Sequence, residues 1–218
     1  MAAGSGERLG AHVPKALVPI GDVPMLVRSV RAALGCDAVA SVVVAAPEGR
    51  EGVTRAMLEP LGARTVVGGG PSRQASVRAA LEAVDERAEI VVVHDAARPF
   101  ATPSLFAAVI EALGEADGAI PVVPLADTVK RVEGGWVVST PARGELAAAQ
   151  TPQAFRAQVL REAHRRAAEQ DLEFTDDAGM LEWAGYRVRA VQGDAGNFKV
   201  TTAADLDRAN ELVRSGGG

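Results

Sequence analysis

Short apolar runs alternate with helical patterns along this chain, and no other feature constrains the fold as strongly. Each run has four to six residues, is rich in Val or Ile, and is bounded by turn residues, as expected of a buried strand. Pro103 is typical of a helix start. The alternation predicts an α/β fold with a doubly wound, mostly parallel, Rossmann-like sheet. The predicted strands are 41–46, 64–67, 89–94, 118–123 and 187–192, and the predicted helices are 25–34, 72–84, 103–113, 152–169, 176–184 and 203–213.

The length and composition suit one folded domain. The chain has 218 residues, and 48% of them are hydrophobic, which is enough for a sizeable core. Only 4% are aromatic, so the core must consist mainly of Ala, Val and Leu. We find no internal repeat and no low-complexity linker. These features predict a single domain over residues 1–214 and a flexible tail over residues 215–218.

Charge and cysteine content exclude several classes of protein. The formal net charge of −5 argues against a general nucleic-acid-binding protein, which needs a basic surface. A few placed cations still suffice for an anionic small substrate. No apolar run approaches the length of a membrane span, and no signal-peptide pattern is found. Cys36 is the only cysteine, which excludes an intrachain disulfide. We expect a cytoplasmic protein with neither nucleic acid nor membrane as a partner.

The segment from Val129 to Arg143 breaks the alternation of strands and helices. Two short strand patterns, Val129 to Val132 and Trp136 to Ser139, flank the sequence Glu-Gly-Gly. A Gly-Gly pair permits a hairpin turn with positive φ. The pattern predicts a projecting β-arm over about residues 129–143.

A strand is missing before the first glycine-rich stretch. Met1 leads directly into small residues, whereas a glycine-rich phosphate loop usually follows a strand that fixes its position. A central strand with about four buried apolar residues contributes roughly 6–12 kcal/mol of burial, comparable to the net stability of a whole domain. We therefore expect residues upstream of Met1 to supply this strand in the native protein.

The first chemical motif is the small-residue stretch near the start of the chain, with two cations beyond it. Small residues let backbone N–H groups approach a triphosphate closely. Arg8 and Lys15 add positive charge, which stabilises a phosphoryl transition state. The spacing matches neither the Walker pattern nor the dinucleotide fingerprint. The alternative is a flexible terminus with solvated cations. The small residues expected to line the nucleotide are Ala2, Ala3, Gly4 and Gly6.

The second motif is a glycine run that precedes a helix. Gly69 and its neighbours, followed by Arg73 and Ser76, make a platform for an anion or a base at a helix start. The alternative is an ordinary strand-to-helix turn with Ser72 as the N-cap. Arg73 and Ser76 are harder to explain by that alternative.

The third motif, His94 to Pro99, follows the strongest predicted strand. Ligands of doubly wound sheets bind at the carboxyl ends of the strands. Asp95 is placed to bind magnesium or a substrate hydroxyl, and Arg98 to bind a phosphate. The alternative is an Asp–Arg pair that orders the loop. His94 is interpreted as a structural residue at the strand end rather than as a catalyst.

Later polar positions complete the set of candidates. Thr175 has a second interpretation as a helix N-cap, and the two aspartates after it favour a helix N-terminus without any further role. Capping does not explain Lys199, which precedes the last helix. No Cys/His cluster indicates zinc, and no Ser-His-Asp spacing indicates a hydrolase. The candidates in this part of the chain are Thr128, Arg143, Thr175 and Lys199.

In their order along the chain, these motifs resemble the family of 2-C-methyl-D-erythritol 4-phosphate cytidylyltransferases of the non-mevalonate isoprenoid pathway. The resemblance extends from Ala2 to about Leu206. It implies transfer of CMP from CTP, the co-substrate, to the polyol phosphate, with release of pyrophosphate. It also implies a homodimer in which the β-arm reaches the partner's site.

The resemblance implies the following residue roles. Catalysis falls to Arg8, Lys15, Arg143 and Lys199. The CTP site comprises Ala2, Ala3, Gly4, Gly6, Gly69, Arg73 and Ser76. The polyol phosphate contacts Asp95, Arg98, Thr128, Thr175 and Lys199. The attacking phosphate oxygen is already anionic, so cations and Mg²⁺ should do most of the work and no general base is needed. Asp95 is also the one candidate metal ligand.

Three alternatives stay open at this point. Ribitol 5-phosphate cytidylyltransferases share the fold and most of the motifs. A non-catalytic nucleotide-binding protein would have less need for Arg8, Lys15, Arg143 and Lys199 together. A sugar nucleotidyltransferase that uses another base is the third.

Overall fold

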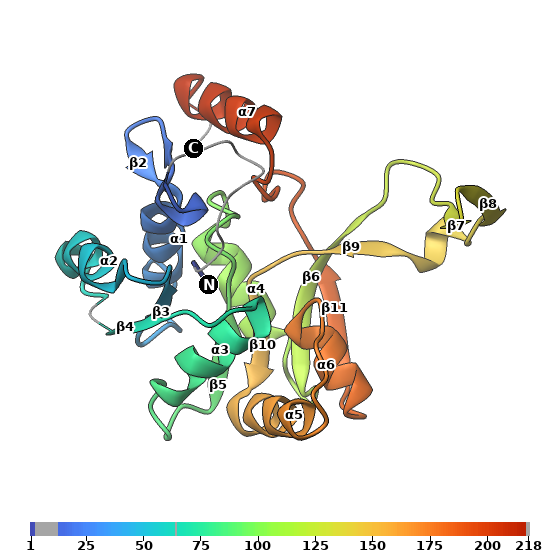
Figure 1. Ribbon diagram of the computed structural model, residues 1–218, viewed down its shortest axis with the longest axis horizontal. Coiled ribbons are helices and arrows are strands. Elements are labelled where there is room, and N and C mark those ends of the chain that lie inside the picture. The colour runs from blue at the N-terminus through green and yellow to red at the C-terminus, as the bar shows by residue number, and fades with distance from the viewer. Residues whose placement is uncertain (3–12, 64, 217–218) are drawn as a thin grey trace.

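The structure, a computed structural model, describes residues 1–2, 13–63 and 65–216. Its body is a mixed sheet in the strand order β11–β6–β10–β5, with β9 paired to the far half of β6 (Figure 1). β11 runs parallel to β6, whereas β10 is antiparallel to both of its neighbours. The strands of this sheet are β5 (Ile90–Val93), β6 (Gly118–Pro124), β9 (Ala147–Ala149), β10 (Gln153–Arg156) and β11 (Val188–Gln192).

A second, parallel pair of strands, β3 (Val43–Ala46) and β4 (Thr65–Gly68), stands beside β5. Its register is Val43 to Thr65 through Ala46 to Gly68. A small antiparallel pair, β1 (Pro19–Ile20) and β2 (Val23–Pro24), precedes the first long helix. The described part of the chain has seven α-helices and three 3₁₀ helices. They are α1 (Met25–Leu34), α2 (Glu51–Leu58), α3 (Arg73–Glu82), α4 (Pro103–Glu111), α5 (Ala157–Glu169), α6 (Asp177–Trp183), α7 (Ala203–Arg214), η2 (Lys15–Leu17), η3 (Glu59–Leu61) and η4 (Arg143–Glu145).

Helices cover both faces of the sheet, which confirms the predicted α/β class. Alternate residues of a strand point to opposite faces. Phe155 of β10 and Val93 of β5 pack with α3, α5 and α6 on one face. Ala154, the next residue of β10, packs with Val109 of α4 on the other. α1 joins α4 on that second face through Ala33 and Phe106.

One predicted helix is partly wrong. The expected helix over 152–169 begins only at Ala157, because residues 153–156 form β10. β10 lies between β5 and β6 and hydrogen-bonds to both, so long-range pairing outweighs the local helical pattern there. The sheet is therefore less uniformly parallel than the alternation of elements suggests. α2 was not among the predicted helices.

Helix caps agree in part with the sequence. Ser72 caps α3 by accepting a hydrogen bond from the Ala75 amide, and Thr202 forms a capping box with Asp205 at α7. Thr175 is not the cap of α6. Asp176 fills that place and accepts from the Gly179 amide, so α6 begins two residues after Thr175.

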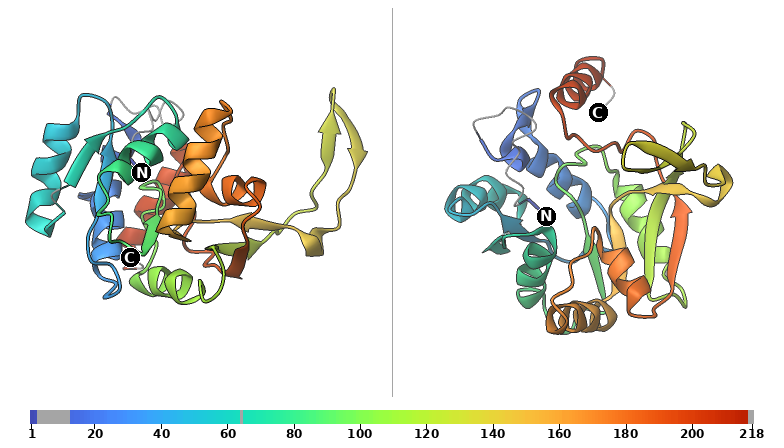
Figure 2. Two further views of the ribbon diagram at one scale, coloured as in Figure 1. Left: turned by 90° about the horizontal axis from the view of Figure 1, so that it is seen from below. Right: turned by 45° about the vertical axis from the view of Figure 1, so that its right-hand side comes forward.

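An antiparallel pair, β7 (Arg131–Glu133) and β8 (Trp136–Ser139), extends away from the body (Figure 2). Gly134 and Gly135 adopt φ of +56° and +84°, as a tight hairpin turn requires. Both strands are exposed throughout, with Trp136 79% accessible. A dimerisation role for this hairpin stays a prediction. Within the described residues, no helix is both long and apolar enough to cross a membrane.

Candidate active site at the carboxyl end of β5

Asp95 is at the centre of the site. It follows β5 by two residues, so the strand carries it to the carboxyl edge of the sheet. Its residue is only 8% exposed, and its backbone N–H donates to the hydroxyl of Thr151 from the loop before β10. A buried carboxylate is stable only with partners, and two cations supply them.

Arg73 and Lys199 bind the two carboxylate oxygens of Asp95. Arg73 Nε lies 3.3 Å from Asp95 Oδ1, and Lys199 Nζ lies 2.7 Å from Asp95 Oδ2. Arg73 comes from the first turn of α3, whereas Lys199 lies in the loop before α7. The structure therefore brings together three predicted site residues, of which Asp95 and Lys199 are 104 positions apart in the sequence.

These contacts determine the ionisation of Asp95. Burial raises the pKa of this carboxyl, but Arg73 and Lys199 outweigh that effect and hold its pKa well below the usual range. Asp95 is therefore an anion at neutral pH. It accepts hydrogen bonds and does not donate a proton.

A buried pair behind Arg73 was not recognised from the sequence. Arg73 Nη1 donates to Asp177 Oδ2 at 2.7 Å, and His164 Nε2 lies 3.0 Å from Asp177 Oδ1. Asp177 was interpreted only as a favourable charge at a helix start, but its side chain is 1% exposed. A signal was present in α5, where His164 shares the buried face of Leu160, Ala163 and Ala167. A histidine on such a face needs a polar partner.

Arg98 is held by carbonyl groups rather than by a carboxylate. Its Nη1 donates to the Asn197 carbonyl at 2.9 Å, and its Nη2 donates to the Ala149 carbonyl at 3.1 Å. The ion pairs of Asp95 are with Arg73 and Lys199, and the Arg98 amide donates to the Asp95 carbonyl at 2.9 Å, so backbone contact rather than an Asp95–Arg98 ion pair orders this loop. Gln150 donates to the Asp194 carbonyl, which ties β9 to the same loop. Arg98 and Lys199 thus belong to one ordered edge.

His94 behaves as the structural residue that was predicted. Its Nε2 donates to the Arg98 carbonyl, so its Nδ1 accepts from the Thr151 hydroxyl. Burial, aided by the nearby amino terminus, lowers its pKa to about 3. The ring is therefore neutral near pH 7.

The loop before α3 is shaped by Ser76 and Gly70. Ser76 Oγ accepts from the Gly70 amide and donates to the Ser72 carbonyl, and Gly69 donates to the Ala46 carbonyl. A Cβ on Gly70 would lie 2.6 Å from the Ala75 Cβ, so this loop and helix approach too closely for a side chain. Ser76 is thus explained by the loop geometry, and its contact with a nucleotide stays a prediction.

Several predicted residues lie elsewhere or outside the described part. Ala3, Gly4, Gly6 and Arg8 fall in the undescribed stretch 3–12. Ala2 is buried and donates to the Ala45 carbonyl at the end of β3, and Lys15 begins η2. Thr175 is exposed just before α6.

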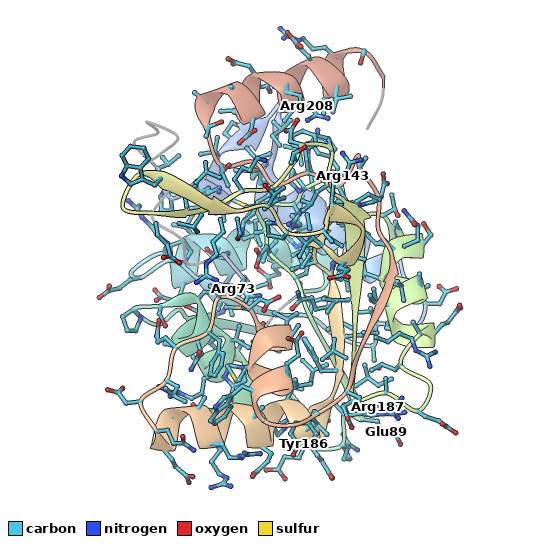
Figure 3. The ribbon with its side chains drawn as sticks, turned by 90° about the vertical axis from the view of Figure 1, so that its right-hand side faces the viewer. Arg73, Glu89, Arg143, Tyr186, Arg187 and Arg208 are labelled. Carbon is cyan, nitrogen blue, oxygen red and sulfur yellow. The ribbon has the colours of Figure 1, made fainter. Side chains whose placement is uncertain are left out.

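Thr128 and Arg143 belong to the stem of the hairpin. Thr128 is exposed, and Arg143 of η4 donates to the Ala126 carbonyl at 2.8 Å. The hairpin points away from the body, whereas Arg73 lies within it, between α3 and α6 (Figure 3). The contacts of Arg143 thus tie it to the hairpin stem and not to Asp95.

The geometry does not favour Asp95 as a magnesium ligand. Each of its oxygens already accepts from a cation. Among the residues the structure describes, no group of three Asp, Glu, His or Cys side chains is arranged to hold a metal. Mg²⁺ is often held mainly by substrate phosphates and water, and its involvement here stays a prediction.

The fold and this cation-lined edge define an α/β enzyme of the nucleotidyltransferase class. The chain belongs to the family of 2-C-methyl-D-erythritol 4-phosphate cytidylyltransferases, whose family model matches residues 1–215. The resemblance inferred from the motifs is thereby confirmed, and so is the class of enzyme.

Individual relatives agree with this assignment. A 2-C-methyl-D-erythritol 4-phosphate cytidylyltransferase from Rhodococcus opacus is 48% identical over 217 residues, covering 99% of this chain and 93% of the relative. A bifunctional enzyme IspD/IspF from Clavibacter michiganensis is 47% identical and covers 98% of this chain. This chain spans only 53% of that relative, about half its length.

Solved structures show the same fold. The crystal structure of 2-C-methyl-D-erythritol 4-phosphate cytidylyltransferase from Thermus thermophilus superposes with a TM-score of 0.82 at 38% identity. The superposition covers 98% of this chain and 96% of the other. The structure of 4-diphosphocytidyl-2C-methyl-D-erythritol synthase from Anaerococcus prevotii gives 0.87 at 28% identity, with coverage of 98% and 93%.

Proposed function

We propose that this chain transfers CMP from CTP to 2-C-methyl-D-erythritol 4-phosphate. The products are 4-diphosphocytidyl-2-C-methyl-D-erythritol, an intermediate of isoprenoid precursor synthesis, and pyrophosphate. The observation that carries the proposal is the group formed by Arg73, Asp95 and Lys199 at the carboxyl end of β5. This group places one carboxylate, a hydrogen-bond acceptor for hydroxyls, beside two cations that can bind phosphate. The combination suits a substrate with both hydroxyl and phosphate groups.

The reaction needs no proton transfer to begin. An oxygen of the acceptor's phosphate attacks the α-phosphorus of CTP and forms a new P–O bond. The bond from that phosphorus to the bridging oxygen breaks, and the electron pair leaves with pyrophosphate. Negative charge accumulates around the phosphorus as the two anions meet. Cations that are already in position lower this barrier.

Each cation has a proposed place in this step. Arg8 and Lys15 stabilise the crowded α-phosphorus. Lys199, whose side chain is 42% exposed, exchanges its contact with Asp95 for the phosphate of the acceptor. Asp95 then accepts a hydrogen bond from a hydroxyl of the polyol. Arg98 and Thr175 line the same substrate.

The nucleotide is proposed to bind across the loops that follow β3, β4 and β5. Ala2 lies between the ends of β3 and β5, and Gly69 continues from β4. Arg73 Nη2 is buried and has no hydrogen-bond partner in the described part of the chain, so it is free to donate to a bound ligand. Mg²⁺, if it takes part, neutralises charge on the triphosphate oxygens.

A homodimer is proposed to complete the site. The hairpin exposes four apolar side chains, Val132, Trp136, Val137 and Val138, between 49% and 79% accessible. Such a surface favours contact with another protein surface. Packing on a second copy would bring Thr128 and Arg143 to the partner's polyol phosphate. We propose a cytoplasmic location, in keeping with its small anionic substrates.

The direct test is pyrophosphate release from CTP with methylerythritol phosphate and ribitol phosphate offered in parallel. We expect release with the former. Release only with ribitol phosphate would assign the acceptor differently, and preference for ATP, GTP or UTP would reject the cytidylyltransferase assignment.

Two variants separate an enzyme from a binding protein. Lys15→Ala and Arg8→Ala should each lower kcat by ~10²-fold or more, as lost transition-state donors do. CTP binding, measured by calorimetry, should change much less. Near-normal turnover in both variants would reject the assigned roles.

A further inference from the structure

Gln74 is a buried amide side chain beside Arg73 that the proposed reaction does not use. It lies in the first turn of α3 and is 8% exposed. Its Nε2 donates to the Leu172 carbonyl and its Oε1 accepts from the Phe174 amide, each at 2.9 Å. The side chain thus bonds to the main chain through both its donor and its acceptor, one on each side of Glu173. It fixes this short segment as a paired strand would.

The segment bound by Gln74 leads directly to Thr175. It belongs to the loop of residues 170–176 between α5 and α6, which is neither helix nor strand. Without regular pairing, such a loop keeps its position only through individual bonds. Thr175 is exposed and is proposed to line the polyol phosphate, so the bonds of Gln74 lie next to a substrate contact.

The chain is also anchored on the other side of Thr175. Asp176 accepts from the Gly179 amide at 2.9 Å and from Gln153 Nε2 at 3.0 Å. Thr175 is therefore an exposed hydroxyl between two anchored residues, Phe174 and Asp176. Loss of the bonds to Gln74 removes one of the two anchors, which loosens the loop but leaves the N-cap of α6 in place.

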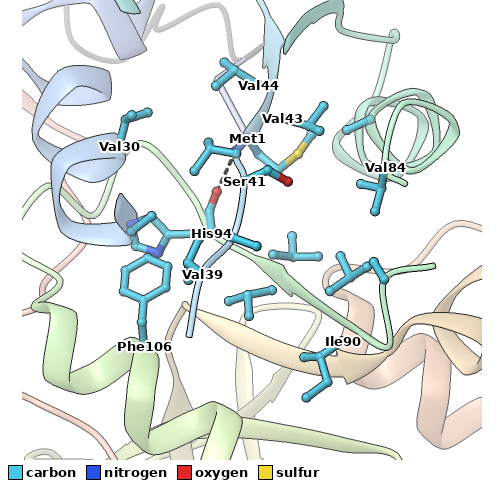
Figure 4. A pocket seen from close by; sticks show the side chains of 18 of the residues that line it. Met1, Val30, Val39, Ser41, Val43, Val44, Val84, Ile90, His94 and Phe106 are labelled. Atoms are coloured by element: carbon cyan, nitrogen blue, oxygen red, sulfur yellow. Dashed lines mark hydrogen bonds between the residues drawn. The ribbon is translucent and has the colours of Figure 1, made fainter. Parts of the chain in front are cut away.

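The position of α3 does not depend on Gln74. Val77 and Leu81 of this helix are 1% and 5% exposed and pack with Phe155 of β10. The same two residues also line an apolar groove between β3 and β5 (Figure 4). Apolar contacts hold the helix, so the two bonds of Gln74 fix the loop rather than α3.

Different side chains of α3 bond to the loops of the two substrates. Ser76 accepts from the amide of Gly70, in the loop proposed to bind the nucleotide. Gln74 bonds to the loop that carries Thr175. A substitution of Gln74 therefore leaves the bond at Gly70 intact, and its effect should fall on the polyol phosphate rather than on CTP.

We propose that Gln74 is a positioning residue for the polyol phosphate, because its two bonds to the main chain hold the Thr175 hydroxyl in place. This role rests on the proposed function, which puts Thr175 at that substrate. A hydroxyl on a loosened loop must be ordered each time the substrate binds, and that cost lowers affinity. The groups proposed to act at the α-phosphorus are elsewhere, so KM should change more than kcat.

The test is a double-mutant cycle that combines Gln74→Ala with Thr175→Val. Each single variant should raise KM for methylerythritol phosphate by ~5-fold or more and leave KM for CTP within about twofold of the parent. The double variant should raise KM for the polyol phosphate no further than Thr175→Val alone, because Gln74 acts through that hydroxyl. A residue that only stabilises the fold would not give this non-additive result.

Arg161→Ala is the matched control at the other end of α3. Arg161 of α5 donates to the Leu81 carbonyl at 2.8 Å and to the Val84 carbonyl at 3.2 Å, so it also joins α3 to another element through main-chain carbonyls. Its loss should lower Tm and leave KM for the polyol phosphate unchanged. An increase in this KM as large as that of Gln74→Ala would overturn the proposal.

Two further measurements guard against a variant that does not fold. Gln74→Glu keeps the shape and the acceptor for Phe174 but turns a carboxylate oxygen toward the Leu172 carbonyl, and it can replace Gln74→Ala in the cycle. Amide exchange needs no variant. In the parent chain the Phe174 amide should exchange ~10-fold or more slowly than the amide of Glu173, relative to their intrinsic rates. Equal exchange at the two positions would overturn the proposal.

The outcomes separate this role from the proposed function. Turnover in the parent with additive effects of Gln74→Ala and Thr175→Val, or with an unchanged KM in Thr175→Val, rejects the role of Gln74 alone. Absence of turnover with both methylerythritol phosphate and ribitol phosphate rejects the proposed function, and this role with it. If only ribitol phosphate is used, the cycle is measured with that substrate.

Discussion

Arg73 binds two carboxylates, and their surroundings differ. Asp177 is 1% exposed, and its second partner is His164, itself 2% exposed. Asp95 is 12% exposed at its side chain, and its second partner is Lys199, which is 42% exposed. One end of Arg73 therefore faces the interior between α5 and α6. The other end contacts Asp95, whose second partner, Lys199, can be reached by solvent and ligands.

This difference in burial suggests different roles for the two carboxylates: Asp177 fixes Arg73 in place, and Asp95 is accessible to a ligand. Burial opposes ionisation of Asp177, but His164 and Arg73 lower its pKa below the usual range, so Asp177 is a buried anion paired with Arg73. Arg73 in turn has its pKa raised by Asp177 and Asp95 despite burial. We infer that Asp177 positions the guanidinium, and that Asp95 is free to exchange Lys199 for a substrate.

The largest expected effect follows from removing the interior partner. Asp177→Ala leaves Nη1 of Arg73 and Nε2 of His164 without their acceptor, and loss of one member of a buried pair destabilises by about 3–5 kcal/mol. Urea unfolding measures this loss. Asp95→Ala is the matched control and should lose much less stability, because Arg73 and Lys199 there are partly solvated. Equal losses in the two variants would erase the distinction.

The next effect tests Lys199, the exposed partner of Asp95. Lys199→Ala should lower kcat by ~10²-fold, because the proposed mechanism uses its ammonium to bind the phosphate of the polyol substrate. Its Tm should stay close to that of the parent, since the lost ion pair is 42% exposed on the lysine side. Lys199→Arg keeps the charge and should recover part of the rate. A Tm loss as large as that of Asp177→Ala would contradict the assignment.

A smaller effect is the pH dependence of stability caused by His94, the residue next to Asp95. Unfolded His94 takes up a proton below pH 6.5, whereas burial holds the folded ring neutral down to about pH 3. Stability contributed by the neutral ring is therefore complete above pH 6.5 and is lost as pH falls toward 3. By about pH 5 the loss is about 2 kcal/mol. Chemical unfolding across this range should show the slope.

His94→Gln should flatten that slope even if it lowers stability at every pH. The carboxylates do not interfere, because Asp95 and Asp177 have lowered pKa values and lose their stabilising charge only below about pH 4. An unchanged slope in the variant would show that another group titrates there, the Met1 amino group being the nearest.

The smallest effect is expected at a third kind of ion pair. Arg165 of α5 bonds to Glu162 and Glu169 on the exposed face of the helix. Exposed pairs contribute little, since water and salt screen them. Arg165→Ala should leave both Tm and kcat within the scatter of the parent. A clear Tm loss would mean that exposure is a poor guide to which pairs matter here.

Most of the elements were predictable because their signals are local. β5 was expected from its run of Val and Ile, α1 was expected at its observed bounds, and Ser72 as a cap was one of the two interpretations of its loop. β10 was not, because residues 153–156 become a strand only through β5 and β6 on either side. The family was also within reach, since the ordered motifs are a property of the sequence.

The roles of site residues divide in the same way. The sequence by itself determined that Arg73, Asp95 and Lys199 are unusual residues at the ends of elements, because spacing and residue type are local facts. Only the tertiary structure decided that Lys199 meets Asp95, that Asp177 and His164 are buried behind Arg73, and that an apolar groove lies between β3 and β5. Those facts depend on contacts between segments up to 104 positions apart, and no local pattern encodes such distances.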